Sequence, residues 1–407
     1  MNRDILIVAQ YTQAPGEFEN DRFRYIAEMI RALDPEVHVE IVTMSFSHHL
    51  KVQRSVSLEQ LKAWKYDMTF IPVNSYRKNV SARRLISNHQ MGSGLSKYLR
   101  KRKKPDVIYC AVPSLDAGYT VAKYAKENTI PFIVDVQDIW PEAFKLVFHV
   151  PVLSSILFYP MEQKANFIYQ CADYVLAVSK TYAERAMRVN SKCTKEMVVF
   201  LGTELSSFDK LAELVAAERE KHDNDVYVAY VGTLGQSYDL TCVIDALSIL
   251  KENGHSEFHF LIMGDGPQQG RFMEHAKASG IDAEFTGRLP YKEMVKRLVA
   301  CDIAVNPIQG GAAQSIINKH ADYAAAGLPV INTQESVEYQ GLLAVYQAGI
   351  TCKNGDVQDM VDKLLLLGKN RELRKQMGAN SRRMAEERFD RGNTYSQIVS
   401  LLIGEDK

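Results

Sequence analysis

The stretch IQGGAAQSIINKHADYAAAGLPVIN, residues 308–332, decides the fold class that we predict for this chain. A glycine-containing loop runs into a predicted helix over residues 316–326, with Ser315 as its N-cap and Gly327 just beyond its end. Pro329 stops the helix, and the apolar residues after it predict a short strand. A loop, a helix and a strand in this order are typical of one step of a doubly wound α/β sheet.

The same alternation extends over nearly the whole chain. The predicted strands of the second half are VYVAYVGTL, FHFLIMGDGP, AEFTGRLP, DIAVNPI and PVINT, and those of the first half include ILIVAQ, VHVEIVT, DVIYCAV and PFIVDV. Such runs predict parallel sheets that are covered on both faces. Residues 201–225 are polar and interrupt the pattern, so we predict Rossmann-like domains over 1–200 and 226–388, a linker over 201–225 and a terminal segment over 389–407.

Composition limits the class of function. The chain has 49 Lys or Arg and 49 Asp or Glu, so no overall charge favours nucleic acid, and we expect none as a partner. Six scattered cysteines, a start without signal-peptide character and the lack of a long apolar run predict a cytoplasmic protein with reduced thiols. No histidine or cysteine spacing suits a metal, so we expect no metal site and interpret His48–His49 as a loop pair.

One region departs from this balance. Residues 77–104 contain ten Lys or Arg and no acid. Ten uncompensated cations favour contact with anionic lipid headgroups, although a solvated helix face is the more common explanation of such a run. The apolar stretch FKLVFHVPVLSSILFYP, residues 144–160, would add hydrophobic contact, or it would simply pack in a core. We therefore expect a peripheral association with a membrane surface.

Glycine turns follow three successive predicted strands of the second half. They are VGTLGQS (231–237), IMGDGPQ (262–268) and FTGRLP (285–290). Each alone is most simply a tight turn, but the carboxyl ends of parallel strands meet at one edge, where ligands bind. We expect these loops to line one site in a cleft between the two domains. The chain has neither GxGxxG nor a Walker A lysine motif, which counts against ordinary dinucleotide and P-loop sites.

Lys319 and Asp322 are three residues apart and so share a face of the predicted helix. Lys319 adds a full positive charge to the field of the helix N-terminus, which suits a diphosphate. Asp322 would accept hydrogen bonds from ribose or sugar hydroxyls. The alternative is a surface ion pair worth a few tenths of a kcal/mol, but such a pair needs no glycine loop in front of it.

Two segments of the first half carry further candidates. In VDVQDIWPEAF, residues 134–144, Asp138 would bind or deprotonate an acceptor hydroxyl, or it would cap the helix that follows. Glu142 is a second carboxylate of this segment. In QAPGEFENDRFRY, residues 13–25, Gly16 lies in a loop and Arg22 would reach the cleft, with one of the two arginines at 22 and 24 kept for a structural ion pair.

Taken together, these segments resemble the GT-B glycosyltransferases of glycosyltransferase family 4, which act in bacterial O-antigen and capsular polysaccharide assembly. The segments that carry the resemblance are VAYVGTL (228–234), IMGDGP (262–267), FTGRLPYKEM (285–294), CDIAVNPI (301–308), SIINKHADYAAAGLPVI (315–331) and DIWPE (138–142). The resemblance implies two Rossmann-like domains facing a cleft, with the terminal helix returning to the first domain. It also implies a retaining, metal-independent transferase whose second domain holds the nucleotide sugar.

The chain departs from the family pattern at several positions. Many members carry two glutamates separated by seven residues, and Gln314 and Asp322 stand at the matching positions here. The usual arginine and lysine are replaced by Thr233 and Tyr238, and a first-domain histidine by Gln137. By resemblance, Lys319, Asp322 and Asp138 are the catalytic candidates, and Arg22, Gln137 and Glu142 lie on the acceptor side. The donor-binding candidates are Gly16, Gly232, Thr233, Gly235, Gly264, Asp265, Gly266, Arg288, Leu289, Gln314 and Ser315.

The resemblance implies transfer of a hexose or N-acetylhexosamine-type sugar from a nucleotide donor, with UDP expected. DIWPE is similar to the branch that uses polyprenyl-diphosphate-linked sugars as acceptors, so a lipid-linked sugar and the anionic inner-membrane surface are the implied partners. No cofactor besides the nucleotide-sugar co-substrate is implied. Two alternatives remain open: a UDP-sugar 2-epimerase of the same architecture, and a non-catalytic glycosyltransferase-like subunit.

Overall fold

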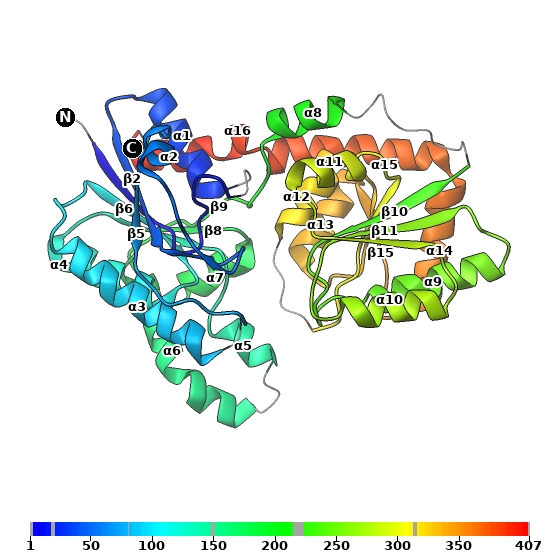
Figure 1. Cartoon of the computed structure of the whole chain (residues 1–407), viewed down its shortest axis with the longest axis horizontal. Helices are drawn as coiled ribbons and strands as arrows, with labels where there is room; N and C mark the ends of the chain where they lie inside the picture. Colours follow the sequence, from blue (N-terminus) through cyan, green and yellow to red (C-terminus); the bar gives the residue numbers. More distant parts are fainter. Residues whose placement is uncertain are drawn as a thin grey trace. The chain divides into compact units, whose positions relative to one another are not determined.

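The computed structural model describes residues 3–17, 21–79, 81–147, 151–214, 224–311 and 316–405, except the side chains at 58, 145–147 and 151–155. The chain divides into two compact units. The first comprises Met1–Val199 and Tyr395–Lys407, and the second comprises Phe200–Thr394 (Figure 1). Each unit is built on one parallel sheet, which confirms the predicted fold class of two doubly wound α/β domains.

The first unit contains a seven-stranded sheet with the order β5-β2-β1-β6-β7-β8-β9. Its strands are β1 Asp4–Val8, β2 His38–Met44, β5 Asp67–Ile71, β6 Val107–Val112, β7 Phe132–Val136, β8 Tyr174–Ala177 and β9 Met197–Val198. Every residue of β1 is buried, as expected for a central strand that is covered on both faces. A short antiparallel hairpin, β3 Phe46–Ser47 and β4 Val52–Gln53, follows β2.

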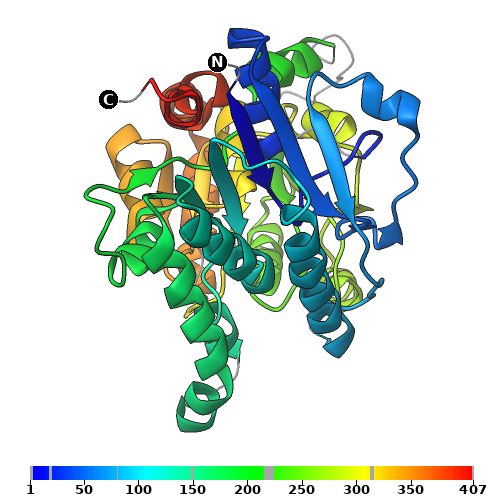
Figure 2. The ribbon, with the colours of Figure 1, turned by 90° about the vertical axis from the view of Figure 1, so that its left-hand side faces the viewer.

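The helices of the first unit cover this sheet. They are α1 Arg22–Leu33, α2 Leu58–Lys62, α3 Ala82–Leu99, α4 Leu115–Asn128, α5 Glu142–Val147, α6 Pro151–Cys171, α7 Lys180–Met187 and α17 Ser396–Ile403. α1 begins where Asp21 accepts hydrogen bonds from two backbone N–H groups, and it buries Phe23, Ile26 and Ile30 at helical spacing. α6 projects from the body of the unit, at the lower tip of Figure 2.

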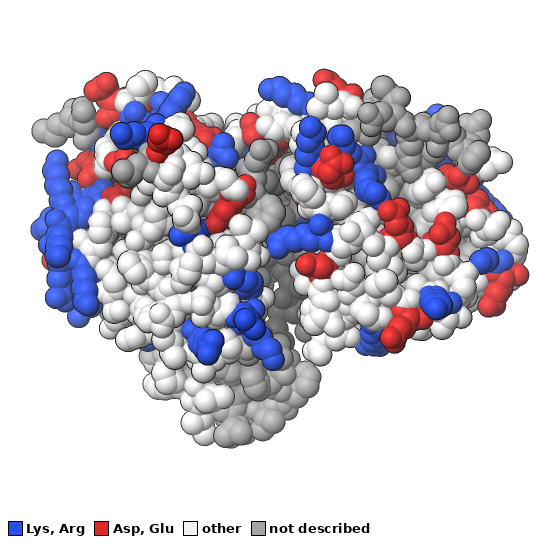
Figure 3. All heavy atoms as spheres, in the orientation of Figure 1, with Lys and Arg blue, Asp and Glu red and all other residues white. Residues whose placement is uncertain are grey.

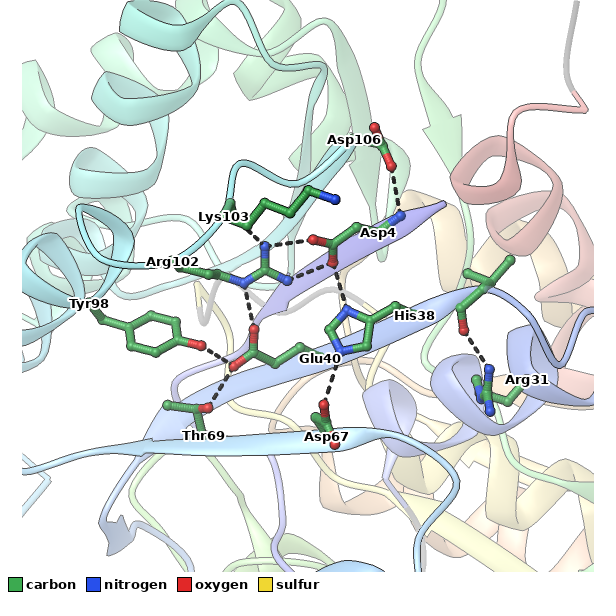
Figure 4. A network of polar contacts seen from close by, with 11 residues as sticks. Asp4, Arg31, His38, Glu40, Asp67, Thr69, Tyr98, Arg102, Lys103 and Asp106 are labelled. Atoms are coloured by element: carbon green, nitrogen blue, oxygen red, sulfur yellow. Dashed lines mark hydrogen bonds and ion pairs between the residues drawn. The ribbon is translucent and has the colours of Figure 1, made fainter. Parts of the chain in front are cut away.

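Arg102, a member of the basic run 77–104, is held by acids from two strands of the sheet. Its Nη2 donates to Asp4 Oδ1 and its Nε donates to Glu40 Oε2, both at 2.6 Å (Figure 4). His38 bonds the same Asp4 carboxylate through Nδ1 at 2.8 Å. The prediction that this run is uncompensated is therefore wrong for Arg102, because the acids come from segments far away along the chain.

α3 separates the two ends of the basic run. Eighteen residues at 1.5 Å each make this helix about 27 Å long, so Arg77, Lys78 and Arg83 lie far from the cations at 100–104. Arg100, Lys104 and Lys123 line a cavity of about 580 Å³ beside the C-terminal end of α3. In Figure 3, Lys and Arg side chains gather on the left-hand edge of the first unit, where Figure 1 places α4. The run is thus two separate basic surfaces.

The second unit contains a six-stranded parallel sheet with the order β12-β11-β10-β13-β14-β15. Its strands are β10 Val226–Val231, β11 Phe258–Met263, β12 Ala283–Gly287, β13 Ile303–Asn306, β14 Val330–Asn332 and β15 Gly349–Thr351. The helices are α8 Leu205–Glu213, α9 Leu240–Glu252, α10 Gln269–Ala278, α11 Tyr291–Leu298, α12 Asn318–Ala325, α13 Val337–Tyr346, α14 Val357–Lys369, α15 Arg371–Met384 and α16 Arg391–Thr394, with a π-helical turn η1 at Ala385–Phe389.

The unit boundaries differ from the predicted ones. α8 lies inside the predicted linker, but it buries Leu205 and Phe208 and belongs to the second unit. Two apolar residues within an otherwise polar stretch are too weak a pattern to reveal this packing. Near the C-terminus, the predicted segment 389–407 begins in the second unit, where Arg391 Nε donates to Leu201 O at 3.0 Å, and only Tyr395 and the residues after it belong to the first.

Within the residues that the structure describes, we find no helix with both the length and the apolar character needed to cross a membrane.

Candidate functional site

The strand-end glycine loops of the second unit come together as predicted. β12, β11 and β10 are neighbours in the sheet, so their carboxyl ends share one edge. A Cβ atom on Gly264 would lie 1.8 Å from Gly232 O, and one on Gly266 would lie 2.4 Å from Leu234 O. Leu234 N donates to Asp265 O at 2.8 Å and fixes the two loops to each other. Glycine is required here because the two backbones touch.

Lys319 lies beside this edge, one residue inside α12. Its side chain is 6% exposed, and its amine lies 4.4 Å from the ring centroid of Tyr230 and 4.1 Å from that of Tyr238. The position of a Cβ on Gly232 would be 3.5 Å from Lys319 Nζ. In the described part of the chain Nζ has no hydrogen-bond partner, and burial lowers the pKa of Lys319 well below its ordinary value. An anion that entered this site would meet an amine that no carboxylate of the described residues holds, and its charge would favour the protonated form of that amine.

Asp322 has a different partner from those of Lys319, although the sequence predicts that the two residues share one face of the helix. Its Oδ1 accepts a hydrogen bond from Tyr291 Oη at 3.0 Å, and Tyr291 in turn lies 2.9 Å from Thr203 Oγ1. Burial raises the pKa of Asp322 to about 6, against the opposing effects of the Tyr291 hydrogen bond and the charge of Arg391. The i,i+3 spacing thus places the two charged groups of α12 against different partners.

The start of α12 also differs from the prediction. The helix begins at Asn318 with Ile317 at the N-cap, two residues later than expected. The backbone N–H of Ile317 donates to His320 Nδ1 at 3.2 Å, so a histidine caps this end. Two candidates just upstream, Gln314 and Ser315, lie outside the described residues.

Sequence reasoning missed a group of buried polar residues at the ends of β13 and β14. Asn306 Nδ2 donates to Asn332 Oδ1 at 2.7 Å and to Gln334 Oε1 at 3.2 Å. The ring of His320 stacks on Tyr339 with 3.7 Å between centroids. Among the described residues, Asn306 Oδ1 and His320 Nε2 are buried without a hydrogen-bond partner. A polar residue that closes an apolar strand, such as the asparagines of AVNP and VINT, was the available signal.

The other donor-side candidates are spread more widely. Thr233, Asp265 and Arg288 are exposed at the ends of their strands, while Gly235 and Leu289 are half-buried. Thr233 contributes its backbone, since its carbonyl accepts from Tyr230 Oη at 2.8 Å. Gly16 belongs to the first unit, where it occupies an exposed turn after β1 with a φ of +82°.

In the first unit, the prediction that Arg22 would reach a ligand site is wrong. Arg22 is buried, and its Nε donates to Asp135 Oδ2 at 3.0 Å. Tyr109 Oη and Gln137 Nε2 donate to the same oxygen at 2.7 and 2.9 Å. Arg22 therefore neutralises a carboxylate inside the sheet, and Gln137 is partly engaged there as well. Sequence spacing cannot reveal a partner 113 positions away.

Asp138 and Glu142 have different surroundings. Asp138 accepts from Ile139 N at 2.9 Å and from Trp140 Nε1 at 3.1 Å, and burial raises its pKa. It therefore binds the turn that follows rather than a helix N-terminus. Glu142 forms an ion pair with Arg185, which makes it a structural partner instead of a free acceptor-side group.

A second cluster that sequence reasoning missed lies at the carboxyl edge of the first sheet. It contains Lys51, Arg84, His48 and Tyr11, which come from the β3–β4 turn, from α3 and from the end of β1. The Lys51 amine lies 3.4 Å from His48 Nδ1, and the rings of Tyr11 and His48 are 4.7 Å apart. Arg84 Nη2 donates to Tyr11 Oη at 3.2 Å. The interpretation of His48–His49 as a mere loop pair is incomplete, because His48 joins this cluster.

Groups of three or more His, Cys, Asp or Glu placed to hold a metal ion are absent from the described residues.

Comparison with known proteins finds a family match within the second unit. Residues 213–384 match the family model of glycosyl transferases group 1. The chain is 23% identical over 298 residues to sulfoquinovosyl transferase SQD2 of Arabidopsis thaliana, a stretch that covers 70% of this chain and 54% of that protein. The chain thus spans about half the length of this relative.

Two solved structures share the fold over nearly the whole chain. HepE of Anabaena, in complex with UDP and glucose, superposes with a TM-score of 0.67 at 15% identity, covering 98% of this chain and 99% of that one. WaaG, a glycosyltransferase involved in lipopolysaccharide biosynthesis, gives a TM-score of 0.68 at 14% identity, with 98% and 100% covered. At such identities the likeness concerns the fold. Residues 213–384 therefore form a glycosyl transferases group 1 domain, in a chain whose two doubly wound sheets have the GT-B fold.

Proposed function

We propose that this chain is a retaining, metal-independent glycosyltransferase that takes a hexose or N-acetylhexosamine-type sugar from a UDP-sugar. The observation that carries the proposal is the unpartnered amine of Lys319, which lies beside the touching glycine loops of β10 and β11 within the family-matched segment. A buried amine without a carboxylate partner loses its proton readily, and an anion that binds beside it restores the charge. The UDP in the structure of HepE supports a nucleoside diphosphate as that anion.

In this proposal Lys319 stabilises the leaving diphosphate. Negative charge develops on the diphosphate as the glycosidic bond breaks, and a preorganised cation in a dry site stabilises that charge more than water does. The N-terminus of α12 adds its dipole next to Lys319. Asp322 acts through Tyr291 or meets the sugar hydroxyls when the donor is bound. Tyr230 and Tyr238 hold the amine by ring contacts that leave its charge available.

The acceptor in this proposal is a polyprenyl-diphosphate-linked sugar, used in O-antigen or capsule synthesis at the cytoplasmic face of the inner membrane. Asp138 is the candidate to orient or deprotonate the acceptor hydroxyl, since it is half-buried and its pKa is raised by burial. Support for a surface-polysaccharide role comes from WaaG, whose own role is in lipopolysaccharide biosynthesis.

A peripheral contact with an anionic membrane belongs to the same proposal. On α6, Ile156 is 70% exposed and Leu157 is 62% exposed, and on α3, Leu85 is 60% exposed. Arg77 and Lys78 are exposed cations before the same end of α3. Apolar side chains beside cations suit the interface of an anionic bilayer, because the apolar groups enter the acyl region and the cations meet the anionic headgroups.

The experiment that tests the proposal is titration of UDP and UDP-sugars into the full chain, followed by incubation with a lipid-linked sugar. We expect UDP to bind, and sugar transfer to require the lipid-linked acceptor. Conversion of a UDP-N-acetylhexosamine without any acceptor would indicate the epimerase instead. If no nucleotide sugar bound by calorimetry, the chain would be a non-catalytic subunit.

A further inference from the structure

Lys51 and Arg84 form a cationic pair on the first unit that no acid of the described residues neutralises. Lys51 Nζ donates to Asn79 Oδ1 at 2.6 Å, and Arg84 Nη1 donates to Asn79 O at 2.8 Å, so both cations share a neutral residue. In the described part of the chain neither makes an ion pair with a carboxylate, and Arg84 Nε is buried without a hydrogen-bond partner. The acids whose charges reach this cluster are Asp138 and Asp116.

Both acids are engaged elsewhere. Asp138 accepts from Trp140 Nε1 at 3.1 Å, and Asp116 pairs with Lys164 of α6. The charge of Arg84 lowers the pKa of Asp138, which burial raises more strongly. The cluster therefore keeps an excess of positive charge.

Burial and the crowding of positive charge lower the pKa values of Lys51 and His48 in this cluster. Burial and then the charge of Arg84 lower the pKa of Lys51 to about 8. Burial, together with the charges of Lys51, Arg84 and His49, lowers the pKa of His48 to about 3, so its ring is neutral. His48 Nδ1 accepts a hydrogen bond from Tyr76 Oη at 2.6 Å. Like charges held together without an acid are relieved when an anion binds between them.

The backbone also holds Lys51 in an unusual conformation. Its φ is +59°, in the left-handed region that a residue with a side chain seldom adopts. Lys51 N donates to Ser47 O at 2.9 Å and closes the turn between β3 and β4. This turn fixes the lysine near His48 and Tyr76, in a backbone conformation that is costly for a residue with a Cβ atom.

Apolar rings lead from this cationic pair to the projecting helix. Arg84 lies 4.9 Å from the ring centroid of Trp140, whose ring is 4.8 Å from Phe144. Phe144 stacks on Phe158 of α6 at 6.0 Å. Ile156, Leu157 and Tyr159 are exposed next to Phe158. Trp140 and Phe158 are buried, so a ligand would meet the exposed side chains of α6 rather than these rings. A ligand that bound both the cations and this surface would be charged at one end and apolar along its length.

We propose that Lys51 and Arg84 form an anion site that binds the diphosphate of an isoprenoid-linked acceptor, with the exposed apolar side chains of α6 receiving the hydrocarbon. This inference rests on the proposed function for the class of acceptor, while its cations and rings belong to the first unit alone. The planar guanidinium suits two phosphate oxygens at once, and the ammonium supplies a point charge beside it.

The test is calorimetric binding of geranyl diphosphate, a short soluble isoprenyl diphosphate, to the full chain saturated with UDP. Saturation with UDP keeps the probe away from the donor side near Lys319. We expect binding in the wild type, with affinity lowered about tenfold or more in Lys51→Met and in Arg84→Met, because each removes a charge-assisted contact. Lys97→Met is the matched control, since Lys97 is exposed near the opposite end of α3, and it should bind like the wild type.

Two further probes separate the sources of the anion. Inorganic pyrophosphate should bind much more weakly than geranyl diphosphate, and geraniol should not compete. Equal binding of pyrophosphate would overturn the isoprenoid assignment and make this a site for free phosphate anions. The anion site is refuted, while the proposed transferase stands, if UDP binds but geranyl diphosphate does not. It is also refuted if geranyl diphosphate binds the Lys51→Met and Arg84→Met variants as tightly as the wild type. Melting curves and the Arg84→Lys variant, expected to retain part of the affinity, separate lost binding from lost folding.

Discussion

The amine of Lys319 lies 4.1 Å from the ring centroid of Tyr238, which stands where the resemblance to the GT-B glycosyltransferases implies a lysine. An aromatic ring there does not repel the lysine, and it holds the ammonium without neutralising it. Tyr230 supports the amine from a second side at 4.4 Å. Two rings thus surround the buried amine of Lys319 without pairing it with a carboxylate.

Lys319→Met should lower kcat by about a hundredfold or more, because it removes the charge that faces the leaving diphosphate. The same variant should unfold at a higher temperature than the wild type, since a buried amine without a partner is replaced by an apolar chain of similar length. Steady-state kinetics and thermal melting measure the two effects. Lys292→Met, at an exposed position of α11, is the control that should change neither. Near-normal turnover in Lys319→Met would remove the lysine from the mechanism.

Gly264→Ala should destabilise the second unit and abolish donor binding. Its Cβ would lie 1.8 Å from Gly232 O, so the two loops would have to separate. We expect a loss of several kcal/mol in the free energy of unfolding, at the upper end of what single substitutions cause. The matched control is Gly270→Ala in α10, where nothing lies within 4 Å of the new Cβ. This control should gain roughly 0.5–1 kcal/mol from helix propensity. Similar stability of both variants, measured by urea unfolding, would contradict the close approach.

Asp322→Asn should change how stability depends on pH. Burial raises the pKa of Asp322 from 3.8 to about 6, so the folded chain binds this proton more tightly than the unfolded chain does. The ionised carboxylate therefore destabilises the fold above pH 6, and this cost disappears as the pH falls from 6 towards 3.8. Asparagine still accepts from Tyr291, and the variant should be more stable than the wild type above pH 6 by up to roughly 3 kcal/mol. Denaturation curves at two pH values test this, and an advantage independent of pH would exclude it.

Ile156→Asp with Leu157→Asp should weaken binding to vesicles that contain phosphatidylglycerol. Both side chains are exposed on α6, so we expect no change in melting temperature. Co-sedimentation with vesicles measures the effect. Leu366→Asp, at a residue of α14 that is 46% exposed, is the control in the second unit. Equal sedimentation of the wild type and the α6 double variant would show that α6 does not contact the bilayer.

Binding of geranyl diphosphate should weaken as the pH rises through about 8, where the free Lys51 amine loses its proton. The bound anion favours the charged amine, so binding itself should shift this titration upwards. In Lys51→Met the affinity for geranyl diphosphate should be lower, and it should depend less on pH across the same pH range. Calorimetry over a pH series checks this, and an identical pH dependence in the variant would assign the titration to another group.

The sequence by itself determined the two doubly wound sheets and the shared edge of the strand-end glycine loops. Both follow from local rules: apolar runs between amphipathic helices make buried parallel strands, and the carboxyl ends of such strands must meet at one edge. It also identified Lys319 as a cation just inside α12, because a lysine behind a glycine loop is a strong local pattern.

Only the tertiary structure decided the partners of the polar side chains. Arg22 forms an ion pair with Asp135, and Asp322 accepts a hydrogen bond from Tyr291. Local spacing suggests ligands as the partners of both side chains. Lys51 and Arg84 come together from a hairpin turn and a helix that no motif connects. Strand order and helix packing bring distant segments side by side, so which charges are neutralised inside the chain, and which remain for a ligand, is settled by the fold.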